Sequence, residues 1–591
     1  MADNPSPNAS TGLTGLGKFI TILLILAFLG GGLYVVAKRT GMLGISAPRS
    51  GSETPVALVT PGGTAAADLP KPEAPDATGV TTVKEYKWVA ADRLPPVKAG
   101  GSQAYKWDPQ TKTVRFTYNV WAGWLPVIAA NHGTKANDQS IFYTKYGFRV
   151  EMVLMDDPIA ARDAFAAGQV HTLWGTADMM VLFAPPLGRD SRTTPRIVQQ
   201  VDWSNGGDGM IVRSGIHNVR DLKGKSVALA QNSPSEYYLT SLLLSAGMKP
   251  SDINAKYTAT AFEAAAAFVA DKSIDACVSW SPDIYQISDR IAGVKILSST
   301  KDANKLIADV YAVRADFVRD HPDVVEGLVA GIFEGMDMVK KDPTEPCKWM
   351  ADAFGMKPQD VMGMRNDAHP TNFGENVQFF LNSSNPTNFE RTWKSAANVY
   401  RVLGRIDAPT EFDKVMDFTF IQNLQKKGLF ADQLDESVPA FTPAMARKIE
   451  GAEAPLTQTI RINFYPNSSN PYEQARDQYG TAVQGKLYDP NVDPTLEAVA
   501  RLAGQFARCI ILIEGHADSS MKGRIPDQAV KDLSLARAAS IKQALVAKYK
   551  FDPNKFTVAG KGWDSPADTN DPQNQALNRR VEISVFPAEQ Q

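Results

Sequence analysis

The distribution of hydrophobic residues divides this chain of 591 residues into unlike segments. Residues 19–37 form one apolar run without a charged side chain, flanked by Lys18 and by Lys38-Arg39. As an α-helix this run would be about 29 Å long, close to the hydrocarbon thickness of a bilayer. We therefore expect residues 1–18 to be an N-terminal tail and residues 19–37 a single transmembrane anchor. A cleaved signal peptide is the alternative, although its apolar core is usually shorter.

Two segments of different character follow the apolar run. Residues 40–79 are rich in Pro, Gly, Ala, Thr and Ser and contain almost no large apolar side chain. Such a segment cannot bury enough surface to fold, so we expect a disordered tether. Residues 80–109 contain two Tyr-Lys-Trp triplets, at 86–88 and 105–107. Their aromatic side chains predict an ordered arm that lies on the next domain.

Strand and helix patterns then alternate over residues 110–450. The runs 114–121, 148–155, 226–230 and 274–280 have the composition of buried strands, and the runs 159–168 and 262–273 show the 3.6-residue period of helices. This alternation predicts an α/β domain with mostly parallel sheets that becomes helical beyond about Asp316. After a short linker, residues 457–591 begin and end with strand patterns (459–465 and 579–586) and hold two helices between them.

Composition and charge exclude several classes of protein. The formal net charge is −2, so no field over the whole chain would recruit nucleic acid. Cys277, Cys347 and Cys509 are far apart and odd in number. They form neither a disulfide framework nor a zinc-binding spacing, and we expect each to be a small buried apolar residue.

Four short motifs stand in register in the C-terminal segment: GHAD at 515–518, LSLARA at 533–538, GKG at 560–562 and NRRVEI at 578–583. Their order and spacing resemble the OmpA-like peptidoglycan-binding domain. The resemblance implies a smaller α/β domain that binds the diaminopimelate of the cell-wall stem peptide. It assigns the ligand's ammonium to Asp518 and its carboxylate to Arg537, with the backbone around Ala517 and Arg580 lining the same groove. His516 is then structural and ties the strand end to its neighbours.

Other interpretations of this segment stay open. The loop between Asp518 and Leu533 is about four residues longer than usual in the family, and Val530 stands where the family usually has Asn. The domain could therefore keep its fold for assembly without binding the wall. A metal site at His516 and Asp518 is not expected, since zinc needs three or four ligands. A catalytic triad is not expected either, because no G-x-S-x-G motif is present.

The central segment resembles the periplasmic solute-binding proteins of the sulfonate, taurine and nitrate class (SsuA-like). The resemblance rests on the stretches 121–126, 148–178, 201–212, 218–239 and 274–283. It implies a two-lobed periplasmic-binding-protein fold that closes on a small ligand. By this resemblance the cleft is lined by Trp121, Trp124, Thr176, Asp178, Asp202, Ser204, Asn205, Asp208, Gln231, Ser233, Ser235, Trp280 and Asp283.

The residue types in this set constrain the ligand. Residues 232–235 place hydroxyl and backbone N–H groups at a helix N-terminus, which is a natural cradle for an anion. Three tryptophans favour a flat or aliphatic body, or a cation through cation–π contact. Several acids argue against a doubly charged anion. The alternative is that the tryptophans are core residues and the acids are helix caps or contacts between the lobes.

These observations together predict a single-pass protein of the bacterial inner membrane with most of its chain in the periplasm. It would capture a small solute, dock on peptidoglycan, and serve an inner-membrane transporter or another partner complex. The superfamily also contains thiamine-pyrimidine synthases, but their Cys-rich stretch is absent here, so neither enzyme activity nor a cofactor is expected. A structural or stator-like scaffold, with the solute-binding fold as a spacer or docking surface, is the alternative.

Overall fold

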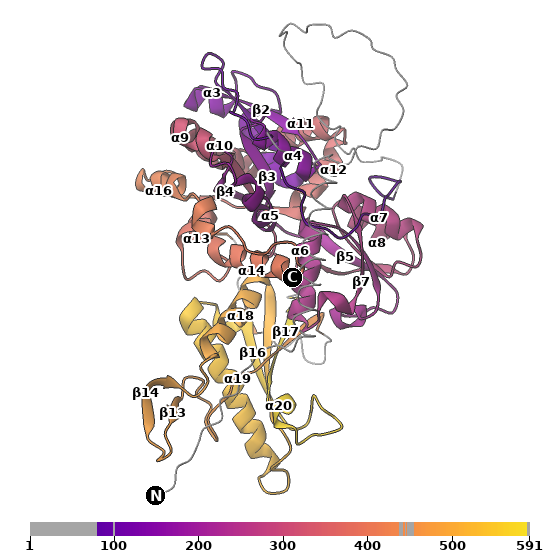
Figure 1. The fold of residues 1–591 in the computed structure, drawn as a ribbon, viewed down its shortest axis with the longest axis vertical. Coiled ribbons are helices and arrows are strands. Elements are labelled where there is room, and N and C mark those ends of the chain that lie inside the picture. Colours follow the sequence, from indigo (N-terminus) through magenta and orange to yellow (C-terminus); the bar gives the residue numbers. More distant parts are fainter. Residues whose placement is uncertain (1–79, 98–100, 437–440, 444, 446–453, 588–591) are drawn as a thin grey trace, which may run out of the picture. The chain divides into compact units, whose positions relative to one another are not determined.

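The structure is a computed structural model that describes residues 80–97, 101–436, 441–443, 445 and 454–587 (Figure 1). The expected tail, anchor and tether lie outside these residues. Among the described helices none is long and apolar enough to cross a bilayer. Cys277, Cys347 and Cys509 are all buried free thiols, which confirms their expected role as small core residues.

The first lobe contains a four-stranded sheet in the order β11-β4-β10-β3. Its strands are β3 (Thr172–Thr176), β4 (Pro195–Ser204), β10 (Ala308–Arg314) and β11 (Ala368–Pro370), and each neighbouring pair is antiparallel. A parallel pair, β1 (Thr113–Tyr118) and β2 (Arg149–Leu154), belongs to the same lobe. Hydrogen bonds between Thr117 and Thr172 join β1 to β3.

Helices cover this lobe, and the local sequence fixes where two of them begin. They are α2 (Leu125–Asn131), α3 (Ile141–Tyr146), α4 (Pro158–Ala166), α5 (Ala177–Leu187), α9 (Ala315–Asp320) and α10 (Pro322–Lys341). The Asp157 carboxylate accepts from the first N–H groups of α4, and the Thr176 hydroxyl accepts from Met179 N–H in α5. Such caps satisfy backbone donors that have no partner inside the helix. They hold the ends of β2 and β3 at one edge of the lobe.

The second lobe is a five-stranded sheet in the order β7-β6-β8-β5-β9. Its strands are β5 (Asp208–Arg213), β6 (Ser226–Ala230), β7 (Asn254–Thr258), β8 (Ala276–Trp280) and β9 (Val294–Ser299). The helices α6 (Pro234–Ser245), α7 (Ala261–Ala270) and α8 (Asp283–Arg290) pack against it. The expectation of mostly parallel sheets is therefore wrong. β5 and β10 each follow a crossing from the other lobe, and each runs antiparallel to both of its neighbours.

The two crossings between the lobes meet at Thr300. Its hydroxyl lies 2.8 Å from the Ser204 hydroxyl and accepts from the N–H groups of Gly206 (2.9 Å) and Asp208 (3.1 Å). The Ser204 hydroxyl donates to the Asp208 carboxylate at 2.7 Å. Because Thr300 is fully buried, this network fixes both connections and forms the hinge region.

Beyond α10 the chain is mainly helical, as expected. The helices are α11 (Thr344–Phe354), α12 (Pro358–Met364), α13 (Phe373–Leu381), α14 (Phe389–Val402), α15 (Phe412–Val415) and α16 (Thr419–Lys426). Trp393 of α14 is a core residue, stacked on Phe389 at 5.7 Å between ring centroids. Tyr400, about two turns further along α14, reaches the first lobe, where its hydroxyl donates to Asp178 at 2.9 Å.

The C-terminal segment contains a four-stranded sheet in the order β12-β17-β15-β16. The strands are β12 (Leu456–Ile460), β15 (Cys509–His516), β16 (Phe556–Gly562) and β17 (Val581–Pro587), and the main helices are α18 (Val492–Gln505) and α19 (Asp527–Tyr549). The first strand is shorter than its pattern predicted, since it ends at Ile460. The hairpin β13 (Gln474–Arg476) and β14 (Ala482–Leu487) and the short helix α20 (Gln575–Asn578) complete this part.

Two glycines of the C-terminal motifs allow α19 to lie close to the sheet. A Cβ on Gly515 would stand 2.2 Å from the Ser534 carbonyl oxygen, and one on Gly560 would stand 2.3 Å from that of Lys531. Both distances are shorter than any real contact, so only glycine fits at these positions. The motifs GHAD, LSLARA and GKG are thus brought together at one end of the sheet.

Candidate functional site

A cavity of about 60 Å³ lies between the two lobes. It is small beside the roughly 300–1,000 Å³ of ordinary ligand pockets, as expected where lobes have closed on each other. Six residues expected from the sequence line it: Trp121, Thr176, Asp208, Gln231, Ser233 and Trp280. The sequence did not identify six others that matter for its chemistry: Asn119, Asp156, Trp174, Thr260, Phe262 and Asp309.

The remaining expected residues lie outside the cavity lining. Trp124 is fully buried and donates to the Asn119 side chain at 2.8 Å. Asp178 accepts from Tyr400, and Ser235 is fully buried in α6. Ser204 belongs to the hinge. These four are buried core or hinge residues that do not line the cavity.

Three more of the expected residues have other partners. The indole N–H of Trp121 donates to both carboxylate oxygens of Asp202 at 3.3 Å, so Asp202 lies at the N–H edge of the ring. Asn205 lines a different and larger cavity of about 730 Å³, which shares no residue with the cleft. Asp283 accepts from the N–H and the hydroxyl of Thr82 in the arm.

The cavity lining is acidic and aromatic. Asp156, Asp208 and Asp309 contribute carboxyl groups, and no Lys, Arg, His or Cys is among the residues that line it. Burial raises the pKa of Asp208 to about 7, although the hydrogen bond from Ser204 opposes the shift. Burial likewise raises the pKa of Asp309 well above its usual range, and the neighbouring Asp202 adds to that shift. A positive charge in the cavity would favour the ionised form of these acids.

The aromatic rings are held in fixed positions. The Trp174 indole donates to the Met155 carbonyl at 2.8 Å, and the Trp121 indole donates to Asp202. Trp280 packs edge to face with Phe262, with 5.4 Å between the ring centroids. The N–H groups of Trp121 and Trp174 already donate hydrogen bonds within the protein. These two rings therefore offer a ligand only their π surfaces. Such surfaces bind aliphatic bodies and cations.

Three helices begin at the cavity, and each has an acidic residue in its first turn that balances the positive end of the helix dipole. Thr176, Ser233 and Thr260 precede α5, α6 and α7, and the first turns of these helices contain Asp178, Glu236 and Glu263. Thr260 and Glu263 form a complete capping box. The Glu236 carboxylate accepts from Asn232 N–H at 2.7 Å and pairs with Arg405 at 2.6 Å. At residues 232–235, where an anionic ligand was expected to bind, the Glu236 carboxylate of the protein itself therefore accepts a backbone hydrogen bond.

The arm contacts both lobes. In the second lobe Thr82 binds Asp283, and Val89 pairs with Tyr257. Asp92 bonds through its backbone to the side chains of Gln231 and Asn232, at 3.3 Å each, so it reaches a residue of the cavity lining.

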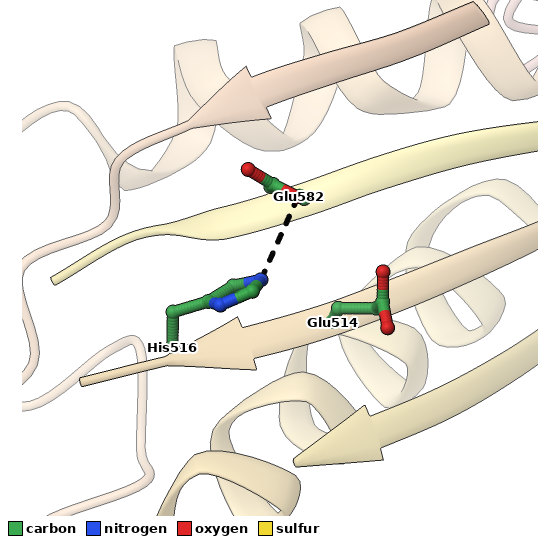
Figure 2. A group of neighbouring side chains, drawn as sticks. All are labelled: Glu514, His516 and Glu582. Carbon is green, nitrogen blue, oxygen red and sulfur yellow. Dashed lines mark ion pairs between the residues drawn. The ribbon is translucent and has the colours of Figure 1, made fainter. Parts of the chain in front are cut away.

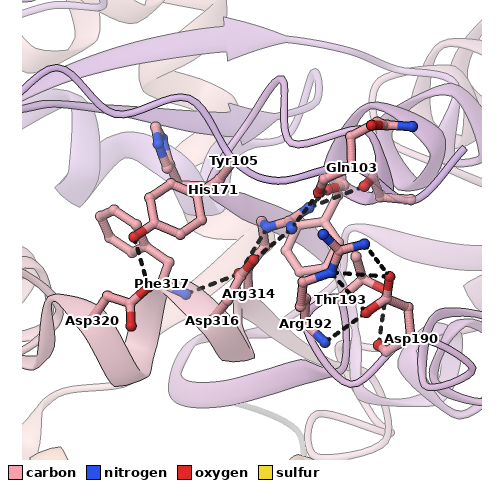
Figure 3. Close-up of polar contacts among 12 residues, drawn as sticks. Gln103, Tyr105, His171, Asp190, Arg192, Thr193, Arg314, Asp316, Phe317 and Asp320 are labelled. Atoms are coloured by element: carbon pink, nitrogen blue, oxygen red, sulfur yellow. Dashed lines mark hydrogen bonds and ion pairs between the residues drawn. The ribbon is translucent and has the colours of Figure 1, made fainter.

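The far end of the arm lies on the first lobe, and Figure 3 shows this contact. The Gln103 carbonyl accepts from Arg314 at 2.8 Å, and the Tyr105 hydroxyl donates to Asp320 at 2.9 Å. The Tyr105 ring packs edge to face with Phe317. The two ends of the arm are thus fixed to different lobes.

In the C-terminal segment Asp518 is buried and Arg537 half-buried. The Asp518 carboxylate accepts from Ser520 N–H at 3.0 Å and from the Arg579 guanidinium. Burial alone would raise the pKa of Asp518, but these hydrogen bonds outweigh it and hold the pKa below its usual value. Sequence reasoning missed Arg579, although it is the first arginine of the NRRVEI motif.

Arg537 carries a positive charge without a counter-ion among the described residues. Its Nε donates to the Ser468 carbonyl at 3.1 Å, and its guanidinium lies 5.0 Å from the centre of the Phe464 ring. Burial and the nearby Arg579 lower its pKa. Arg580, also expected near the groove, pairs with Glu582 and donates to the Ser565 carbonyl. A carboxylate ligand would supply the partner that Arg537 lacks.

His516 contacts the neighbouring segment of the chain through its backbone and through its ring, whose Nε2 lies 3.6 Å from a Glu582 carboxylate oxygen. Its backbone N–H donates to the Arg580 carbonyl at 2.9 Å. Neither ring nitrogen has a hydrogen-bond partner, although the residue is buried. The side-chain contact to β17 is therefore an ion pair rather than a hydrogen bond.

Comparison with known proteins identifies two families in different parts of the chain. Residues 136–346 match the family described as NMT1/THI5 like, and residues 484–580 match the OmpA family. The outer membrane protein Omp38 of Acinetobacter baumannii (strain ATCC 19606) is 30% identical over 151 residues, which are 25% of this chain and 36% of that protein. This chain thus spans about a third of the length of Omp38.

Two further similarities concern the central segment. A chain of Brucella abortus (strain 2308) named as a binding protein is 28% identical over 235 residues, which are 39% of this chain and 68% of that one. The alkanesulfonate-binding protein SsuA of Xanthomonas axonopodis pv. citri, solved with MOPS, is 15% identical with a TM-score of 0.40, and the match covers 52% of this chain and 99% of that one. Residues 136–346 are therefore similar to the NMT1/THI5-like family, and residues 484–580 are similar to the OmpA family.

Proposed function

We propose that this chain is a solute-binding protein of the bacterial envelope, anchored at residues 19–37 and docked on peptidoglycan by its OmpA-family domain. Its two-lobed domain would capture a small organic cation from the periplasm. Delivery of the solute to an inner-membrane transporter, or signalling of its capture to a partner complex, is the expected use. The proposed solute-binding domain spans residues 110–450, and the proposed OmpA-family domain spans residues 457–591.

The observation that carries the proposal is the composition of the cavity between the lobes. Three carboxyl groups and three indole rings line it, and no basic side chain does. A sulfonate or nitrate would leave its charge without a counter-ion, and burying an unpaired charge is costly. An ammonium or amidinium group would instead ionise the neighbouring acids and lie against the rings. A cation–π contact alone contributes about 0.5–2 kcal/mol.

The helix starts around the cavity support the same choice. Helix N-termini favour anions, but the carboxylates of Asp178, Glu236 and Glu263 already stand in the first turns of α5, α6 and α7. The hydroxyl and amide groups of Thr176, Gln231 and Thr260 remain as hydrogen-bonding partners at the cavity wall. They would orient a neutral polar end of the ligand.

The OmpA-family domain supplies the proposed docking. Asp518 and Arg537 would hold the ammonium and the carboxylate of diaminopimelate, with Ala517 and Arg580 beside them. In favour of this assignment, Arg537 is half-buried without a counter-ion in the described structure, and Asp518 is held ionised. Since Arg579 occupies Asp518 here, the ligand's ammonium must displace that guanidinium or share the carboxylate with it.

A scaffold function remains as the second candidate, and specific contacts favour it. The arm bonds to Gln231 and connects the two lobes, and the cavity is small. If the arm locks the lobes permanently, the solute-binding fold is only a rigid spacer. The two candidates differ in whether the lobes open to admit a ligand.

A thermal-shift screen of the full chain separates these functions. The screen would compare alkylammonium, quaternary ammonium and aminopyrimidine compounds with sulfonates and nitrate. A ligand at 100 times its dissociation constant stabilises its domain by about 2.7 kcal/mol, which is a readable shift. We expect hits among the cations alone, lost in Asp208→Asn and kept in the surface control Asp289→Asn. Hits only among the anions would replace cation binding by anion binding. The absence of any hit would remove the solute-binding function and favour the scaffold.

A further inference from the structure

The C-terminal sheet brings together three side chains of the types that bind metal ions: Glu514, His516 and Glu582 (Figure 2). Glu514 of β15 lies directly opposite Glu582 of β17 in the antiparallel register. His516 is two residues beyond Glu514, so all three side chains project from the same face of the sheet. One ligand atom from each lies within 4.8 Å of the other two, and His516 Nε2 stands 3.6 Å from a Glu582 carboxylate oxygen.

The imidazole of His516 is buried without a hydrogen-bond partner. Its side chain is 2% exposed, yet both ring nitrogens lack a hydrogen-bond partner. A buried polar group without a partner costs roughly 1–3 kcal/mol and is rare in native proteins. Figure 2 shows the ring between the two strands, with a nitrogen directed at Glu582. The position therefore calls for a group that accepts the nitrogen's lone pair.

We propose that Glu514, His516 and Glu582 bind a divalent transition-metal ion, with Zn²⁺ the best match. Zn²⁺ binds both imidazole nitrogen and carboxylate oxygen, and a site with three protein ligands takes water in the fourth position. Bonds of 2.0–2.1 Å in a tetrahedral site place neighbouring ligand atoms about 3.3 Å apart. The observed 3.6 Å between His516 and Glu582 needs a shift of only a few tenths of an ångström. The imidazole nitrogen disfavours Mg²⁺ and Ca²⁺, which prefer oxygen ligands.

Two basic side chains neighbour the site and set its affinity. Arg580 Nε holds Glu582 Oε1 at 2.8 Å, which leaves Oε2 toward the imidazole. Lys561 Nζ holds Glu514 Oε1 at 3.1 Å. The Arg580 side chain is 5% exposed, so it would stay bonded to Glu582 when a metal binds and would orient that carboxylate. The Lys561 side chain is 45% exposed and can turn into water, so it competes with the metal for Glu514 and weakens binding.

No sequence motif predicts this set of three residues. In the sequence His516 stands close to Asp518, but the Asp518 carboxylate is bonded to Ser520 and Arg579. Glu582 comes from a strand much later in the chain, and only the pairing of β15 with β17 brings it to His516. The site is thus separate from the proposed diaminopimelate clamp, although both lie at the same end of β15.

Isothermal titration of the full chain with ZnCl₂ tests the site, using protein without a histidine tag that has been freed of metal by a chelator. We expect one saturable site, with affinity reduced at least tenfold in His516→Ala and in Glu582→Gln. His217→Ala changes an exposed histidine elsewhere and should leave the affinity unchanged. Mg²⁺ and Ca²⁺ should give no saturable heat at the same concentrations.

Lys561→Met provides a test that loss of folding cannot imitate. Removing the competing ammonium should tighten Zn²⁺ binding at least threefold. Co²⁺ added to the same variant should give the visible absorption of a tetrahedral site, which His516→Ala abolishes. Absence of saturable Zn²⁺ binding, or an affinity that is the same in wild type, His516→Ala and Lys561→Met, would overturn the proposal.

Discussion

At the residue scale, the proposed cleft and the proposed C-terminal clamp both contain buried ionisable groups with few partners. Asp208 and Asp309 line a cavity that offers them no cation, and Arg537 has no carboxylate partner among the described residues. Burying such groups lowers stability unless a ligand or a hydrogen bond compensates. These groups therefore support the two proposed binding sites, and each can be tested by itself.

The clamp predicts that Asp518→Ala and Arg537→Ala each reduce binding to purified peptidoglycan sacculi at least tenfold. Each substitution leaves one charge of the diaminopimelate unpaired in a half-buried site, where charge-assisted hydrogen bonds are strong. A sedimentation assay with the full chain measures this. Arg524→Ala, an exposed position in the neighbouring loop, should bind like wild type. Binding that survives both clamp substitutions would contradict the assignment.

The buried acids predict an unusual dependence of stability on pH. Burial raises the pKa of Asp178 to about 6 and that of Asp208 to about 7. The folded chain thus keeps protons that the unfolded chain releases above about pH 4, so these acids make the free energy of unfolding fall as pH rises from 4 to 7. Asp208→Asn removes the contribution of Asp208 to this change in the free energy of unfolding, which is of order 1–4 kcal/mol.

Denaturant unfolding at pH 5 and pH 8, followed by tryptophan fluorescence without ligand, measures this effect. The free energy of unfolding should differ less between the two pH values in Asp208→Asn than in wild type. The surface variant Asp289→Asn should keep the wild-type difference. Equal differences in wild type and Asp208→Asn would show that the Asp208 pKa is not raised.

At the element scale, the close approach of α10 to α2 depends on Gly335. A Cβ there would lie 2.0 Å from the Pro126 carbonyl oxygen, so Gly335→Ala must force the two helices apart. We expect a loss of about 1–3 kcal/mol in the free energy of unfolding, as for other overpacked cores. Gly363→Ala is the matched control, because α12 has open space at that position. It should be neutral or stabilise by up to about 1 kcal/mol. Equal effects of the two substitutions would contradict this packing.

The elements that sequence patterns predicted well are those with strong local signals. Asp157-Pro158 and the Thr260/Glu263 capping box mark helix starts through contacts within a few residues. The GHAD and LSLARA motifs marked one end of the C-terminal sheet because Gly515 and Gly560 admit α19 closely. The antiparallel strands β5 and β10 were missed, since strand direction depends on how the chain crosses between lobes rather than on periodicity.

The cleft was predicted only in part, for the same reason. Trp121, Asp208 and Trp280 were found because they stand in stretches with a family resemblance. Asp309 was missed, since it lies in β10 and reaches the cavity through long-range pairing with β3 and β4. Trp124 and Asp178 do not line the cavity, because a helix or strand residue near the cleft can face either the cavity or the core. They bond to Asn119 and Tyr400 instead, and their role toward a ligand stays a prediction.

At the scale of the whole molecule, the two lobes and the arm form one system. Hinge contacts at Thr300 and arm contacts at Thr82 and Gln103 all connect the lobes. Ligand entry must therefore open the cleft while the arm stays attached to one lobe or stretches between them. A cation that stabilises the closed form would bind more tightly as pH rises from 5 to 8, because its binding releases protons from the cavity acids.

The most direct measurement of the central claim is a calorimetric titration of the full chain at pH 8 with a matched pair of ligands. The pair consists of the tightest-binding ammonium compound of the screen and the sulfonate with the same hydrocarbon body. Our account predicts saturable 1:1 binding of the ammonium, at least tenfold weaker in Asp208→Asn, and no binding of the sulfonate. Equal or tighter binding of the sulfonate, or no binding of the ammonium, would contradict it.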